Sequence, residues 1–149
     1  MPKILLFLAL FIALFLSGCS NDEGKKENKR LSIEITQALL REKFDYLDLS
    51  VLSKTDWDRV CIIAPYALAE DVEKQIGFKW DGLFNTGRGN EGVVSLLFIK
   101  DKTVVEFIVH PRYEGDFLGS HGCISREDAK FVKLEDKNGW LKLTQKMNN

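Results

Sequence analysis

The hydrophobic pattern divides the chain into an apolar segment, a polar segment and a mixed remainder. Residues 4–16 are all apolar and follow Lys3, whereas residues 20–30 contain no aliphatic or aromatic side chain. A stretch so polar cannot bury enough surface to fold, which predicts a flexible tether. Residues 31–149 are long enough for one small domain with one core and too short for two.

The first part of the domain predicts two helices and a buried strand. Apolar residues at helical spacing follow a serine or threonine that can cap the first helix; these are Ser32 or Thr36, then Ile35, Leu39, Leu40, Phe44 and Leu47. Residues 48–56 have no clear period and are predicted to be loop. Residues 57–64 are rich in β-branched side chains and stop at Pro65, which predicts a buried strand. A second helix is predicted from about Ala67, with Gly77 as its left-handed end.

The second part of the domain predicts hairpins. Residues 78–92 contain four glycines and are predicted to be a long surface loop, with Phe78, Trp80 and Phe84, like Trp57 earlier in the chain, packed in the core or on the loop. Residues 93–99 and 103–109 are two β-rich runs separated by a short polar turn, which predicts a hairpin. Residues 125–128 resemble a helix start, and residues 131–134 and 140–143 predict a last hairpin.

These elements together predict an α+β fold. We expect one small domain with an antiparallel sheet built on hairpins and two helices at one side of it, because the order of elements does not fit alternating βαβ units.

The sequence Leu16-Ser17-Gly18-Cys19 resembles the lipobox of bacterial lipoproteins. The apolar run before it is shorter than the ~20 residues that a transmembrane helix needs, so residues 1–18 are expected to be a signal peptide that is removed. The resemblance implies acyl chains such as palmitate on Cys19, and therefore a lipid bilayer as the first partner. Several acyl chains anchor a protein firmly, at ~0.8 kcal/mol per buried methylene.

The resemblance also implies a location and a division of the chain. Because Ser20, and not aspartate, follows the anchor, the sorting rule of Gram-negative lipoproteins implies the outer membrane, with the protein facing the periplasm. We expect a signal peptide at residues 1–18, a lipidated tether at 19–30 and the folded domain at 31–149.

Charge and spacing argue against two other classes of function. The chain has 21 basic and 22 acidic side chains, and removal of residues 1–18 takes away only Lys3, so no basic excess favours nucleic-acid binding. His110 and His121 could in principle bind zinc with Cys61 and Cys123, but no CxxC or HxxxH spacing occurs. We expect neither a metal nor a cofactor.

Cys61 and Cys123 are the two cysteines that remain once Cys19 carries lipid. An even pair in an oxidising compartment predicts one disulfide. It would close a loop of about 60 residues and stabilise the domain by ~4 kcal/mol in the loop-entropy model.

The segment Ser120-His121-Gly122-Cys123-Ile124 resembles the Ser-His-Gly-Cys-aliphatic signature of L,D-transpeptidases, which act on peptidoglycan. The resemblance implies that Cys123 is a thiolate nucleophile with a nearby histidine as base and backbone amides around the oxyanion. The chain departs from the family by placing Ser125 where an arginine is expected. His110 also lies closer to Ser120 than the family's second histidine does.

A longer resemblance is to small bacterial lipoproteins of unknown activity. It extends over about residues 57–129 and rests on a set of short motifs: Trp57, Val60-Cys61-Ile62-Ile63, Pro65-Tyr66, Gly77-Phe78-Lys79-Trp80, Pro111-Arg112, Asp116-Phe117 and Cys123. It implies a structural second cysteine and a membrane address.

Two functions therefore stay open. One is a non-enzymatic envelope protein that binds a protein partner, for example an immunity factor. The other is a cysteine-dependent, L,D-transpeptidase-like enzyme that uses Cys123, His121 and Ser120. They differ in what they require of Cys123, because binding is compatible with a disulfide and catalysis requires an activated thiolate.

Overall fold

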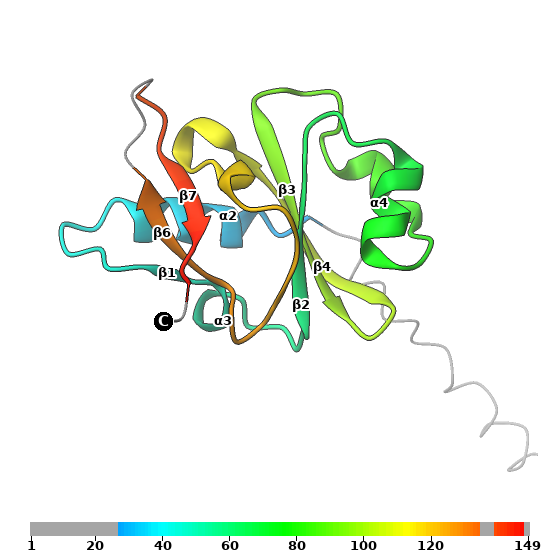
Figure 1. Ribbon diagram of the computed structural model, residues 1–149, viewed down its shortest axis with the longest axis horizontal. Helices are drawn as coiled ribbons and strands as arrows, with labels where there is room; N and C mark the ends of the chain where they lie inside the picture. Colours follow the sequence, from blue (N-terminus) through cyan, green and yellow to red (C-terminus); the bar gives the residue numbers. More distant parts are fainter. Residues whose placement is uncertain (1–26, 135–138, 148–149) are drawn as a thin grey trace, which may run out of the picture.

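The computed structural model describes residues 27–134 and 139–147, which form two antiparallel sheets and three α-helices (Figure 1). The larger sheet has the strand order β4-β3-β2-β5 and the smaller one the order β1-β6-β7. The strands of the two sheets are β1 (Leu47–Asp48), β2 (Arg59–Ile63), β3 (Val93–Lys100), β4 (Thr103–Pro111), β5 (Gly122–Ser125), β6 (Lys130–Leu134) and β7 (Lys142–Gln145). The predicted α+β fold in one small domain is confirmed.

The predicted central hairpin is confirmed as β3 and β4, the longest strands of the fold. Residues 101–102 connect them, and Asp101 adopts φ 52°, a left-handed conformation that tight hairpin turns require. The strand predicted before Pro65 is β2, which pairs with β3 on one side and with β5 on the other.

Helix α2 (Lys29–Leu39) begins earlier than predicted. Its N-cap is Asn28, whose side chain accepts the Leu31 backbone N–H, so neither Ser32 nor Thr36 is the cap. The folded part therefore includes residues 29–30, which were assigned to the tether. The helix ends at Leu39, with Leu40 as its C-cap, so the predicted helical residues Phe44 and Leu47 lie beyond it, and Leu47 begins β1.

Two further predictions of local structure are wrong. Residues 49–52 form the short helix α3 (Leu49–Leu52), where loop was expected, because the Asp48 carboxylate accepts the Ser50 N–H at 2.9 Å and caps it. No helix starts at Ser125. Its hydroxyl donates to the Asp128 carboxylate at 2.8 Å in a turn between β5 and β6.

The last hairpin is confirmed by the pairing of β6 with β7, although β7 begins at Lys142, two residues later than predicted. Part of its connection, including Asn138, lies outside the described residues. The predicted long loop contains the 3₁₀ helix η2 (Asp81–Asn85), and η3 (Arg112–Glu114) and η4 (Phe117–Gly119) follow β4.

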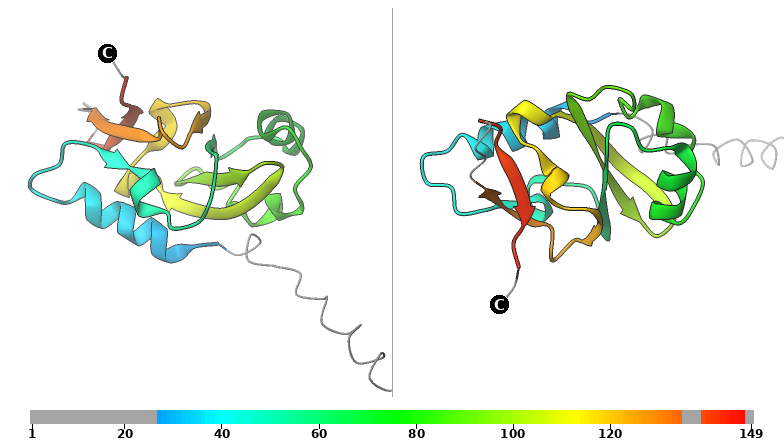
Figure 2. Two further views of the ribbon diagram at one scale, coloured as in Figure 1. Left: turned by 90° about the horizontal axis from the view of Figure 1, so that it is seen from below. Right: turned by 45° about the horizontal axis from the view of Figure 1, so that its top comes forward.

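The helices cover opposite faces of the larger sheet, where one side was expected. The α2 face contains Ile35 and Leu39 packed with Ile62, Leu96 and the small sheet. The other face is covered by α4 (Ala69–Ile76), which ends at Gly77 as predicted. Figure 2 shows α2 and α4 on the two sides of β3 and β4. Alternate residues of the central strands are thus buried in two separate clusters, which explains why both hairpin arms are apolar nearly throughout.

Candidate functional site

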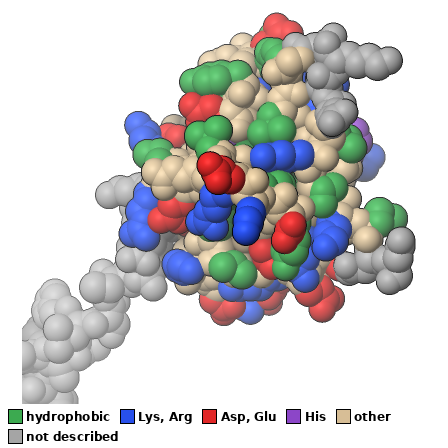
Figure 3. Space-filling view, turned by 90° about the vertical axis from the view of Figure 1, so that its left-hand side faces the viewer, with side chains coloured by type: hydrophobic (Ala, Val, Ile, Leu, Met, Phe, Trp, Pro, Cys, Tyr) green, Lys and Arg blue, Asp and Glu red, His purple; other side chains and the backbone are tan. Residues whose placement is uncertain are grey.

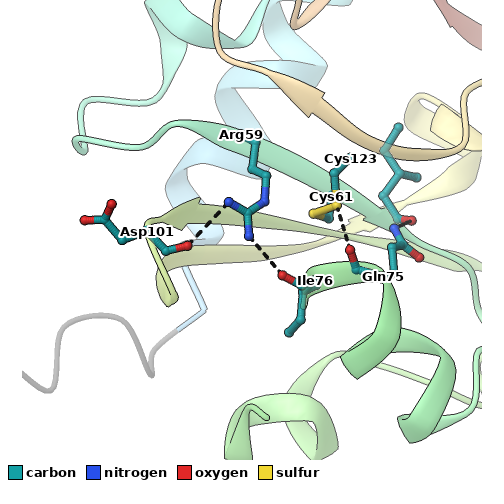
Figure 4. The surroundings of a disulfide bond; sticks show 7 residues. Arg59, Cys61, Gln75, Ile76, Asp101 and Cys123 are labelled. Atoms are coloured by element: carbon teal, nitrogen blue, oxygen red, sulfur yellow. Dashed lines mark hydrogen bonds between the residues drawn. A yellow bond between two sulfur atoms is a disulfide. The ribbon is translucent and has the colours of Figure 1, made fainter. Parts of the chain in front are cut away.

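Cys61 and Cys123 form the predicted disulfide. They face each other directly on neighbouring strands, β2 and β5, with their Cα atoms 4.0 Å apart (Figure 4). Cys61 is fully buried and Cys123 is partly exposed, on the face that α4 covers. Because β5 is the outermost strand of the larger sheet, the bridge fastens that edge to the centre of the fold.

The carboxyl end of α4 points at this bridge. The Gln75 carbonyl oxygen lies 3.5 Å from Cys123 Sγ, and the Arg59 guanidinium donates to the Ile76 carbonyl at 2.9 Å (Figure 4). Carbonyl oxygens at a helix C-terminus carry partial negative charge, which disfavours an anion beside them. The site therefore favours a disulfide or a neutral thiol at Cys123 and opposes a thiolate.

The other residues of the Ser-His-Gly-Cys segment do not assemble around the sulfur. Ser120 is buried, and its hydroxyl oxygen accepts the Gln145 backbone N–H at 2.8 Å, which joins the segment to β7. His121 is exposed to solvent. Gly122 has φ +83°, which glycine adopts without strain, and β5 begins there.

His110, the second histidine, lies on the opposite face of the larger sheet from Cys123. It is fully buried in the α2 face, where its Nδ1 lies 2.8 Å from the Ser32 hydroxyl and its ring meets Phe117. Burial lowers the pKa of His110 to about 4, although Glu114 acts in the opposite direction. The histidine is neutral at neutral pH and cannot serve as a base for Cys123, because the sheet separates them.

Apart from the disulfide, the described part of the molecule has a shallow surface hollow of about 690 Å³. It is lined by Ser50, Lys54, Thr55, Asp56, Trp57, Asp58, Ser125, Arg126 and Glu127. The Arg126 guanidinium lies 4.9 Å from the centre of the Trp57 ring and donates to the carbonyls of Thr55 and Ser50. Arg126 therefore organises the chain around the hollow. This role could not be predicted from the sequence, because residues 125–128 resemble a helix start and no local pattern links Arg126 to Trp57.

The four aromatic residues expected to pack have different environments. Trp57 is buried, and Phe78 and Trp80 are partly buried against the α4 face. Phe84 is wrongly assigned, because its side chain on η2 is 88% exposed. A 3₁₀ helix with an isolated aromatic residue gives no period from which its exposed side could have been predicted.

Comparison of the chain with known protein families, with curated proteins and with solved structures gives no match. Within residues 27–134 and 139–147, no cluster of three or more metal-ligating His, Cys, Asp or Glu side chains occurs. In the same residues, no helix is long and apolar enough to cross a membrane. Cys19 and the rest of the lipobox lie outside the described part of the chain.

Proposed function

We propose that this chain is a lipid-anchored protein of the bacterial envelope whose domain acts by binding and not by catalysis. The observation that carries the second half of this proposal is the disulfide between Cys61 and Cys123. It occupies the sulfur that the Ser-His-Gly-Cys resemblance would make the nucleophile. An enzyme of that class needs a free thiolate.

The surroundings of Cys123 support the same conclusion for the reduced chain. A thiolate there would lie beside the Gln75 carbonyl, and His110 is out of reach on the other face of the sheet. A cysteine nucleophile is normally activated by a cation, a histidine or a helix N-terminus. The Arg59 guanidinium, labelled in Figure 4, directs its hydrogen bonds at the carbonyls of Ile76 and Asp101.

The anchor is supported by the apolar run at residues 4–16 and by the lipobox that ends at Cys19. We place the acylated protein on the outer membrane of a Gram-negative cell, facing the periplasm, with a protein partner in the envelope. An oxidising compartment also suits the disulfide.

The anchor is tested by intact-mass measurement of the full chain expressed in a Gram-negative host. We expect cleavage before Cys19 and a mass increase that corresponds to acyl chains, together with recovery in the membrane fraction. Cys19→Ser should lose the acyl mass and the membrane recovery. An unacylated wild-type protein would contradict the proposal.

The absence of catalysis is tested by alkylation of the exported protein with and without prior reduction. We expect Cys61 and Cys123 to react only after reduction. After reduction, Cys123 should react no faster than a model thiol at neutral pH, because the site opposes the thiolate. Rapid alkylation of Cys123 without reduction would instead revive the transpeptidase hypothesis, and assays on peptidoglycan stem peptides would then decide it.

A further inference from the structure

The start of the folded domain is held at the free edge of β4. The Asn28 backbone N–H donates to the Phe107 carbonyl at 2.8 Å, and its side-chain amide donates to the buried Glu106 carboxylate. Glu27 forms a parallel bridge to Phe107 as well. These contacts fix the point at which the chain leaves the fold toward Cys19, at the edge of β4.

Side-chain contacts connect the same edge of β4 to η2. The Phe107 ring meets the Trp80 ring edge to face, with centroids 5.4 Å apart. Trp80 in turn covers Gly82 of η2 so closely that a Cβ atom there would lie 2.2 Å from the indole. This contact holds η2 beside the strand, and Phe84, two residues further along η2, points into solvent.

Two further large apolar side chains are exposed on the segment between β2 and α4. Tyr66 is 65% exposed and Leu68 58% exposed. Their segment is hydrogen-bonded to the glycine-rich loop that follows η2, since Arg88 donates to the Ala67 carbonyl at 3.1 Å. We name Tyr66, Leu68 and Phe84 the apolar rim. Exposed apolar side chains that gather at one end of a small domain are typical of an interaction surface.

The opposite end, which carries the small sheet, also exposes large apolar side chains, among them Leu40 and Met147, but it mixes them with charged ones. Figure 3 shows hydrophobic, basic and acidic side chains interspersed over it, with no large area of one kind. Aromatic rings near that sheet lie under cations, Phe44 under Lys133 at 4.3 Å and Tyr46 under Lys146 at 4.4 Å. Among the described residues, no such cation–ring contact involves Tyr66 or Phe84.

We propose that the apolar rim rests on the lipid bilayer to which Cys19 is attached. This inference depends on the proposed anchor. Seven residues, 20–26, separate Cys19 from Glu27, so the exit point at β4 cannot lie more than about 30 Å from the membrane. This limit keeps the aromatic and aliphatic side chains next to that exit within reach of the interface, where such side chains are favoured. The domain is thus oriented with the end around α4 and η2 toward lipid and the small sheet toward the periplasm.

The test uses the acylated protein reconstituted into phosphatidylcholine vesicles with plain or brominated acyl chains. Bromine quenches tryptophan only on contact, so Phe84→Trp reports whether position 84 enters the bilayer. The matched control is Leu40→Trp, which is also exposed, at 77%, but lies at the far end of α2 beside β6, where Lys133 binds the neighbouring carbonyl. Emission of the wild-type protein supplies the background from the native tryptophans.

We expect Phe84→Trp, but not Leu40→Trp, to lose emission in brominated vesicles beyond the wild-type background. A second reporter, Leu68→Trp, should lose emission in the same way and guards against a local effect at η2. If the variants float with the vesicles but neither rim reporter is quenched, the orientation is wrong while the anchor stands, and the rim is left for a protein partner. If the wild-type protein does not float at all, the anchor fails, and this inference fails with it.

Discussion

The two faces of the larger sheet are stabilised by different chemistry. On the α2 face, three polar contacts join the helix to β4 and η3: Asn28 with Glu106, Ser32 with His110, and Thr36 with Glu114. The two members of each pair are 78 residues apart, and successive pairs are four residues apart along both segments. On the α4 face, buried apolar residues surround a single covalent link.

The difference shows which interactions fix the position of the helix on each face of the sheet. Polar contacts that recur along α2 set its register on the sheet, because a shifted helix would leave Glu106 and His110 buried without these partners. The α4 helix is short, and it makes fewer directional contacts with the sheet, among them Gln75 with the Ile62 carbonyl at 3.0 Å. The disulfide beneath α4 therefore has a larger share in holding that side together.

Removal of the disulfide is expected to have the largest effect. The double variant Cys61→Ala, Cys123→Ala opens a loop with a sequence separation of 62 residues. The loop-entropy model then predicts a loss of about 4 kcal/mol in the free energy of unfolding. Urea denaturation of the oxidised proteins measures this loss directly.

Reduction of the wild-type protein provides the control for this first prediction. It should lower stability by a similar amount, whereas the double variant should not respond to the reductant. A free energy of unfolding for the double variant within about 1 kcal/mol of the wild-type value, the typical effect of a single substitution, would mean that the α4 face does not depend on its covalent link.

Acid is expected to weaken the α2 face through His110. Burial lowers its folded-state pKa from 6.5 to about 4, so the unfolded chain binds more protons between these values. Stability therefore rises with pH in this window, is fully present above 6.5 and is lost as the pH falls toward 4, by roughly 3 kcal/mol. Chemical denaturation measured at steps between pH 7 and 4 follows this loss.

The variant His110→Gln isolates this contribution, since glutamine cannot titrate but can keep a polar contact with Ser32. Its stability at neutral pH should be lower than that of the wild type, and its loss between pH 6.5 and 4 should be clearly smaller. Equal losses in the two proteins would assign the acid sensitivity to groups other than His110.

The sequence predicted those elements whose pattern is local. The central hairpin, β2 and the end of α4 at Gly77 follow from β-branched runs and single turn residues. The start of α2 was missed because Ser32 and Thr36 look like caps, yet their hydroxyls serve contacts with His110 and Glu114 that lie far away in sequence.

The candidate site was predictable in its composition but not in its geometry. Counting cysteines was sufficient to predict the bridge between Cys61 and Cys123. No spacing rule could show that α4 would direct the Gln75 carbonyl toward Cys123, or that His110 would lie on the other face. Those facts depend on strand order, and the proposal of binding over catalysis depends on them.

The smallest predicted effect concerns how the two helices end. Helix α4 ends at Gly77 with φ +88°, where a side chain would meet no atom within 4 Å. Gly77→Ala should therefore cost only the backbone strain of a left-handed alanine, about 1 kcal/mol. Helix α2 ends at Leu40 with φ −86°, an ordinary helical value, and Leu40 is largely exposed.

Leu40→Ala is the matched control, and it should change the free energy of unfolding by less than about 0.5 kcal/mol. Thermal or urea unfolding of the two variants side by side tests the pair. If Gly77→Ala were as stable as the wild type, the end of α4 would have to relax out of the left-handed conformation. The Gln75 carbonyl would then no longer be held at Cys123, and the reduced Gly77→Ala protein should show a more reactive thiol than the reduced wild type.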